Sequence, residues 1–160
     1  MSLMETSTIL WRQRELLSLL LFKLDTESLI LAAGRTRWLG TATYEVEMVL
    51  EQVRTNELLR ATAVDQLAVE LGLQSDSTLA ELIAVLEDPW QEAFIEHRKA
   101  LLGLTAEIDG AVRANRDLLT SGQRAVLEAL RVVGVTSGLY RPDGSMASAP
   151  TGAHLIDEAV

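Results

Sequence analysis

The chain contains no cysteine, and it has only three prolines, none of them before residue 89. Aromatic residues make up only 4% of its 160 residues. The lack of cysteine excludes a disulfide framework, thiol catalysis and zinc–thiolate sites. A β-sandwich or β-barrel would need aromatic and β-branched runs broken by turn residues, and these are missing too. The composition is that of a leucine-rich helical protein.

Basic residues are also few. The chain has 14 lysines and arginines against 23 aspartates and glutamates, which gives a formal net charge of −9. Twelve of the acidic residues and only two of the basic ones fall within residues 41–96. A nucleic-acid-binding surface carries the opposite charge, so this balance argues against such a function.

No long hydrophobic run is present. The richest apolar stretch, from Leu16 to Phe22, has seven residues, includes Ser18 and is flanked by charged residues. A membrane span needs about 20 apolar residues, and a signal peptide needs an apolar region followed by a small-residue cleavage site. We therefore expect a cytoplasmic protein that does not insert into a membrane.

What the sequence does contain is apolar residues at helical spacing. Leu10, Leu17, Leu24 and Leu31 recur every seven residues, and such a stripe needs a partner surface. Similar patterns predict further helices, and together the four expected helices cover residues 8–33, 41–71, 77–87 and 89–133. Possible kinks in the last helix are indicated by its internal glycines, Gly103, Gly110 and Gly122.

Residues that start and end helices flank these segments. Gly34 and Gly72 fit helix C-termini, where a left-handed residue is common. The expected N-terminal caps are, in chain order, Thr6 to Thr8, Ser75 to Ser77, and Asp88 followed by Pro89 as first helical residue.

The predicted fold is all-α. The short link 34–40 makes the first two helices an antiparallel hairpin. A short helix and a long C-terminal helix complete a coiled-coil-like bundle, with residues 1–133 as a single domain. Residues 134–160 are rich in glycine, proline and serine, and we expect a flexible tail there.

No catalytic constellation is present. The sequence lacks a Walker loop, a G-x-G-x-x-G fingerprint and any Glu-x-x-His pair. Glu92 and Glu96 lie one helical turn apart, but a solvated acidic face explains them better than a metal site. His97, on the apolar stripe, is more typical of a core residue than of a ligand or base. We expect no enzyme activity, no metal and no cofactor.

Two motifs resemble those of known families. The turn Trp38-Leu39-Gly40 between two helices resembles the W-x-G signature of helical-hairpin substrates of type VII secretion. Their export tag has a tyrosine followed four residues later by an acid, whereas Tyr140 is followed at that distance by Gly144. A type VII substrate or partner is therefore the alternative interpretation, and a tryptophan filling the end of the hairpin is a simpler one.

The C-terminal third carries a more specific pattern. The run Asn115-Arg116-Asp117-Leu118-Leu119 is followed by Gly122-Gln123, Val126, Leu127 and Leu130, and then by Leu139-Tyr140-Arg141-Pro142-Asp143-Gly144. An N-x-x-L-L helix followed by an L-Y-x-x-D-G turn resembles the FlgN family of flagellar export chaperones. The leucine-rich opening, residues 10–17, is similar to the first helix of the longer, actinobacterial form of that family.

The resemblance implies a cytoplasmic chaperone of flagellar type III export. Such a chaperone binds the C-terminal helical segments of hook–filament junction proteins of the FlgK and FlgL type and delivers them to the export-gate component FlhA. The client-binding residues implied are Asn115, Leu118, Leu119, Gln123, Val126, Leu127 and Leu130. The gate-docking residues implied are Leu139, Tyr140, Asp143 and Gly144.

Alternatives remain open for these residues. Asn115 lies on the apolar stripe, and a buried hydrogen bond that fixes helix register is favoured over contact with a partner. The leucines and Val126 are either ordinary core or a groove for another helix. Tyr140 is either a loop residue or the anchor of a docking peptide.

Overall fold

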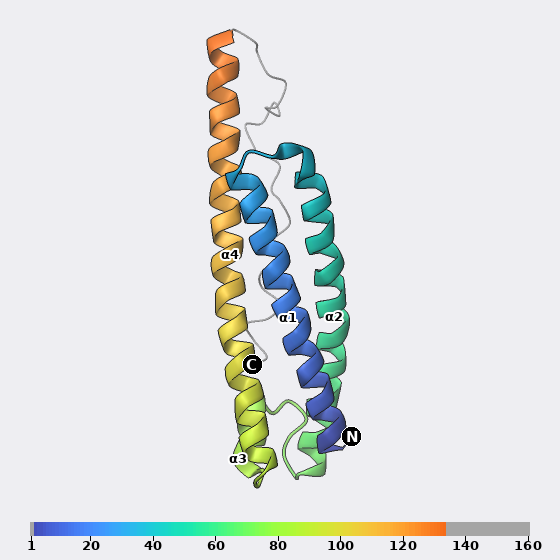
Figure 1. Cartoon of the computed structure of the whole chain (residues 1–160). Helices are drawn as coiled ribbons and strands as arrows, with labels where there is room; N and C mark the ends of the chain where they lie inside the picture. Colours follow the sequence, from blue (N-terminus) through green and yellow to red (C-terminus); the bar gives the residue numbers. More distant parts are fainter. Residues whose placement is uncertain (1, 134–160) are drawn as a thin grey trace.

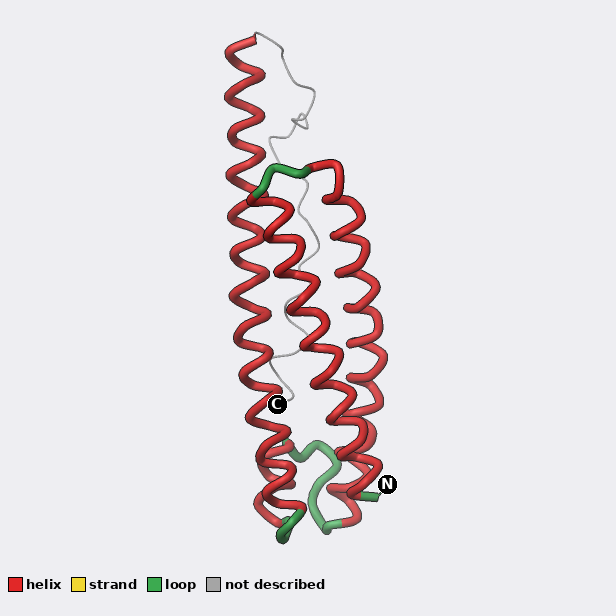
Figure 2. Tube along the Cα trace, viewed as in Figure 1, coloured by secondary structure: helices red, strands yellow, loops and turns green. Residues whose placement is uncertain are grey.

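A computed structural model of the chain describes residues 2–133. Within this range there are only helices and loops (Figure 2). The elements in chain order are α1 (Leu3–Ala32), the 3-10 turn η1 (Thr36–Trp38), α2 (Leu39–Glu70), α3 (Leu79–Val85) and α4 (Trp90–Val133). The predicted all-α architecture is confirmed. The predicted tail, residues 134–160, lies outside the described residues.

Helix α1 is the central element. It packs against α2 on one side and α4 on the other, while the short α3 packs mainly against α4 (Figure 1). The chain reverses at η1, so α1 and α2 are antiparallel as predicted, whereas α4 runs parallel to α1. Because α1 has two large neighbours, its wide leucine stripe is buried on both sides.

The core follows the predicted periodic positions. In α4, Phe94, Leu101 and Ile108 recur every seven residues and are all buried. Their partners on the other helices share the same helical spacing. The buried apolar residues of those helices include Leu10, Leu16, Leu17, Leu20 and Leu24 of α1, Val46, Val49, Val53, Val64 and Leu67 of α2, and Leu79 and Leu82 of α3.

A buried polar network joins α1 to α2. The Asn56 side-chain amide donates to Gln13 Oε1 at 2.6 Å, and Gln13 Nε2 donates to Glu57 Oε2 at 3.1 Å. Arg60 Nε donates to the same Glu57 oxygen at 2.9 Å. These groups satisfy one another only in one alignment of the two helices, so the network fixes their register.

The helix starts differ from the sequence-based expectation. Helix α1 begins five residues earlier than predicted, because Ser2 and Glu5 form a reciprocal capping box. The predicted caps Thr6, Ser7 and Thr8 are wrong, since all three lie inside the helix, and Thr6 and Ser7 are buried. A residue inside the core can resemble a cap in sequence because both roles use small hydroxyl side chains.

The start of α3 is corrected in the same way. Thr78, and not a residue of the preceding Ser75 to Ser77 segment, caps α3 in a second capping box with Glu81. Helix α4 begins at Trp90, so Pro89 precedes the helix instead of occupying its first position.

The two helix C-terminal predictions are confirmed. Gly34 has φ +66° and Gly72 has φ +78°, the left-handed conformation in which a side chain is strained. Helix α4 runs without interruption through its three glycines.

Candidate functional site

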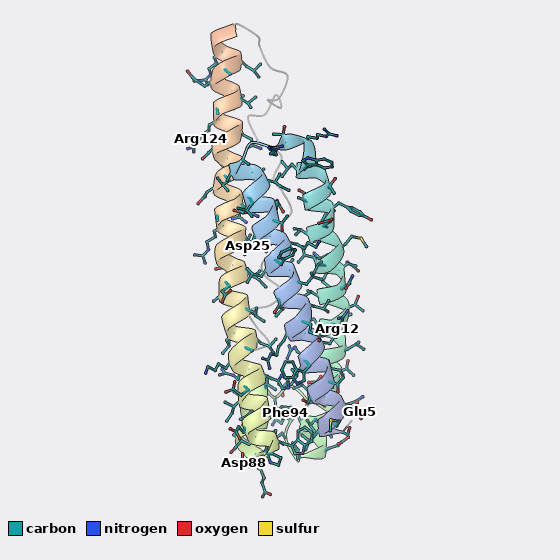
Figure 3. All side chains as sticks on the ribbon, viewed as in Figure 1. Glu5, Arg12, Asp25, Asp88, Phe94 and Arg124 are labelled. Carbon is teal, nitrogen blue, oxygen red and sulfur yellow. The ribbon has the colours of Figure 1, made fainter. Side chains whose placement is uncertain are left out.

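The register of α1 against α4 leaves one end of α4 beyond the hairpin. Ser7 hydrogen-bonds His97, and Leu24 hydrogen-bonds Asn115, at sequence offsets of 90 and 91. With these offsets Ala32, the last residue of α1, lies level with residues 122–123 of α4. Residues 124–133, here called the α4 extension, therefore project past the hairpin by about 15 Å, at 1.5 Å per residue. Figure 1 shows this end of α4 rising past the turn between α1 and α2, and Figure 3 places Arg124 close to the level of that turn.

The face of α4 that packs on α1 continues into this extension. Leu119, Val126 and Leu130 lie 11, 18 and 22 residues after the buried Ile108, which is close to three, five and six turns of helix. They therefore share the face of Ile108. Val126 is 55% exposed and Leu119 is also exposed, whereas Leu130 is partly buried. The apolar face of α4 is thus longer than the helix that covers it.

Six of the seven predicted client-binding residues gather at this end of α4. Leu118 and Leu127 are partly buried and flank the continued face, and Gln123 is exposed. We call the apolar members the end face: Leu118, Leu119, Val126, Leu127 and Leu130. No helix among residues 2–133 packs on the part of the end face that lies in the extension.

The seventh predicted residue, Asn115, lies inside the α1–α4 interface. Its side chain is 4% exposed, and its Nδ2 donates to the Leu24 carbonyl oxygen at 3.0 Å. This contact fits the interpretation that Asn115 fixes helix register. Its other polar atom, Oδ1, is buried and has no hydrogen-bond partner among the described residues.

Glu27 is a buried polar residue of α1 that the sequence analysis missed. It lies one turn beyond Leu24 on α1, is 8% exposed, and takes part in no hydrogen bond or ion pair given for residues 2–133. Burial raises the pKa of its carboxyl group, because the charged form loses hydration. The sequence feature that could have identified Glu27 as buried is its position within the leucine stripe, three residues after Leu24.

The residues considered above as metal ligands or catalytic groups do not form a metal or catalytic site in the described part of the chain. Glu92 and Glu96 are exposed on the surface of α4, and His97 is buried in the core. In the part of the chain that the structure describes, no three histidine, aspartate or glutamate residues are placed to hold a metal ion.

Trp38 lies at the end of the hairpin, as predicted, but does not fill it. Its side chain is 48% exposed, with the Arg37 guanidinium 4.8 Å above its ring. The predicted gate-docking residues, Leu139, Tyr140, Asp143 and Gly144, lie outside the described residues. None of the helices described is long and apolar enough to span a bilayer.

The fold and the end face define a helical bundle whose longest helix carries an apolar surface beyond the hairpin. The family model described as FlgN protein matches residues 1–148, so the chain belongs to the FlgN family. This is a family of flagellar export chaperones, which bind flagellar proteins and are not enzymes. The match includes Trp38 to Gly40 and so removes the basis for the type VII interpretation. Neither a curated protein nor a solved structure gave a match.

Proposed function

We propose that this protein is a cytoplasmic chaperone that binds the C-terminal helical segments of hook–filament junction proteins of the FlgK and FlgL type. The observation that carries the proposal is the continuation of the α4 apolar face past the end of α1. An apolar helix face without a neighbour is the surface on which an amphipathic helix docks.

The mechanism is the covering of one apolar helix by another. A client segment that assembles only in the finished flagellum exposes an apolar face while it is still inside the cell. Such a segment packs on Leu119, Val126 and Leu130. It lies against the side of α4 that α1 covers lower down and that α1 is too short to cover here. Premature association of the client is then blocked until export.

Delivery of the client to the export gate is assigned to the tail, residues 134–160. Leu139, Tyr140, Asp143 and Gly144 would form the peptide that docks on FlhA, with the tyrosine ring as its anchor. The family match supports this assignment because it extends to residue 148 and includes the motif. Client binding and gate docking then use separate parts of the chain.

Substitution of Val126 by aspartate tests the proposed client site. A carboxylate buried under the client would cost several kcal/mol, so we expect Val126→Asp to weaken binding of a junction-protein C-terminal segment at least 100-fold. The free energy of unfolding should hardly change, because residue 126 lies beyond α1 and is largely exposed. Fluorescence anisotropy measures the binding, and circular dichroism monitors the fold.

Val69→Asp is the matched control. Val69 is also a helical valine, it is 58% exposed, and it lies near the end of α2 away from η1. We expect this variant to bind the client segment like the wild-type protein. Wild-type affinity in Val126→Asp, with its helix content intact, would show that the client binds elsewhere.

A further inference from the structure

The face of α2 that points away from α1 carries a regular series of mostly uncharged side chains. Its positions are spaced alternately three and four residues apart along the whole helix, which is the spacing of a coiled-coil seam. Every position is exposed to solvent. We call this series the α2 seam: Thr41, Tyr44, Met48, Glu51, Thr55, Leu58, Thr62, Asp65 and Val69.

The α2 seam presents an apolar surface to solvent. Its large apolar members are all exposed: Tyr44, Met48, Leu58 and Val69. The hydroxyl groups of Thr55 and Thr62 donate to the backbone carbonyl oxygens four residues earlier, at 3.0 and 2.9 Å, so their methyl groups are left for contact. Figure 3 shows side chains of α2 projecting into open space on the side away from α1. A further amphipathic helix can pack on such a surface.

The surroundings of the α2 seam are acidic. Residues 41–96 contain twelve acidic and only two basic residues, and both basic side chains form ion pairs with glutamates of α2. Glu47, beside the seam, and Asp65, within it, are exposed and take part in no ion pair given for residues 2–133. A helix with lysines or arginines beside its apolar residues would therefore bring cations to these carboxylates.

This charge also separates a basic helix from other occupants of the seam. A second copy of the chain would place the same acidic surface against itself, and like charges across an interface are unfavourable. Residues 134–160 contain one basic residue against three acidic ones, so they do not form a basic helix. An anionic lipid surface is repelled for the same reason as a second copy.

We propose that the α2 seam binds a basic amphipathic helix of a partner protein. The apolar residues of that helix pack on the apolar positions of the seam, and its lysines or arginines lie beside Glu47 and Asp65. The seam is about 42 Å long at 1.5 Å per residue, so a helix of about eight turns fits along it. One helix cannot cover both this seam and the end face, because the seam points away from α1 and the end face lies on the side of α4 that α1 covers lower down. The two surfaces are therefore independent sites.

A pair of synthetic peptides tests the proposal. Each peptide has about 28 residues, which is four heptads, with leucines at the spacing of the seam. Lysines flank the leucines in one peptide and glutamates flank them in the other. We expect the lysine peptide to bind the full-length chain with an affinity that falls as the salt concentration rises, and the glutamate peptide to bind at least tenfold more weakly. Fluorescence anisotropy measures both affinities.

Leu58→Gln locates the binding surface. The loss of this apolar side chain should weaken binding of the lysine peptide at least tenfold. The fold should survive, because Leu58 is 73% exposed, and circular dichroism checks it. Leu29→Gln is the matched control, since Leu29 is a helical leucine of α1 that is 72% exposed. We expect wild-type affinity from this control.

Asp65→Asn tests the contribution of charge. Removal of the carboxylate should weaken binding of the lysine peptide severalfold and reduce the salt dependence of its affinity. Asp25→Asn is the control, because Asp25 is an exposed aspartate on α1. It should change neither the affinity nor its salt dependence.

Three results would overturn the proposal. The first is that the lysine peptide does not bind, or that both Leu58→Gln and Tyr44→Gln bind it as tightly as the wild-type protein does. The second is a loss of binding in Val126→Asp but not in Leu58→Gln, which would place the peptide on the end face. The third is a dimer that dissociates in Leu58→Gln and does not respond to the peptide, which would place a second copy on the seam. Because the client segment is a different probe, none of these results decides the proposed function.

Discussion

The imidazole Nε2 of His97 and the hydroxyl oxygen of Ser7 lie 3.0 Å apart across the α1–α4 interface. The rings of Trp11 and Phe94 pack in T-shaped geometry against the same imidazole, which is fully buried. Burial, and secondarily the nearby Arg14 guanidinium, lower the pKa of His97 to about 4. The side chain is therefore neutral in the folded protein at neutral pH, as a core residue should be.

This shift predicts a pH-dependent stability. Between pH 6.5 and about 4 the unfolded chain binds a proton at His97 and the folded chain does not, so the free energy of unfolding falls as the pH falls through this window. The loss attributable to His97 should reach about 3 kcal/mol at pH 4. Urea unfolding followed by circular dichroism, compared with His97→Gln, measures it. A difference between the two proteins that stays constant from pH 7 to pH 4 would contradict the prediction.

The Glu57–Arg60 ion pair should contribute far more to the free energy of unfolding than a similar ion pair on the same helix. The Arg60 side chain is buried, and within residues 2–133 its ion-pair partner is Glu57, so Glu57→Ala should destabilise the protein by about 3 kcal/mol. Glu51 and Arg54 have the same spacing on α2 but are exposed, and Glu51→Ala should cost less than about 1 kcal/mol. Denaturant titration compares them, and equal losses would show that burial does not govern these pairs.

The glycines of α4 are expected to be replaceable. A Cβ added at Gly103 or Gly110 would meet no atom within 4 Å. Each substitution by alanine should therefore stabilise the protein by about 0.5–1 kcal/mol through helix propensity. Gly34→Ala is the control, and it should destabilise by about 1 kcal/mol because φ is +66° there. Thermal unfolding tests the three variants, and a loss at Gly103→Ala would reveal an unrecognised close contact.

Tyr140→Ala tests the proposed division of labour between the bundle and the tail. Because Tyr140 lies outside residues 2–133, which form the four helices, its loss should leave the free energy of unfolding and the client affinity unchanged. Without the aromatic anchor the chaperone should no longer engage the gate, and the client should accumulate inside the cell. Immunoblotting of cell and medium fractions measures this. An equal loss of client binding would instead make the tyrosine part of the client site.

Much of the fold was predictable because its causes are local. The seven-residue recurrence of Leu10, Leu17 and Leu24 predicts a helix with a buried face, since those side chains line up on one side of a helix wherever it packs. Gly34 and Gly72 mark helix ends because few other residues adopt a positive φ at low cost. The apolar residues of the end face and the asparagine at position 115 were also visible in this way.

Tertiary structure decided which residues cover those faces. The roles of Thr6 and Ser7 as core residues follow from where the other helices pack. The Ser2 cap, by contrast, is a local S-x-x-E signal with Glu5 that the sequence analysis missed. The offset of 90 and 91 residues between α1 and α4 results from many packed side chains acting together. That offset alone leaves the α4 extension uncovered and brings the Asn115 side chain to the Leu24 carbonyl. The sequence by itself determines which faces are apolar, because periodicity is a property of one helix. Only the packed bundle decides where a face lacks a neighbour, because that depends on the relative lengths and alignment of separate helices.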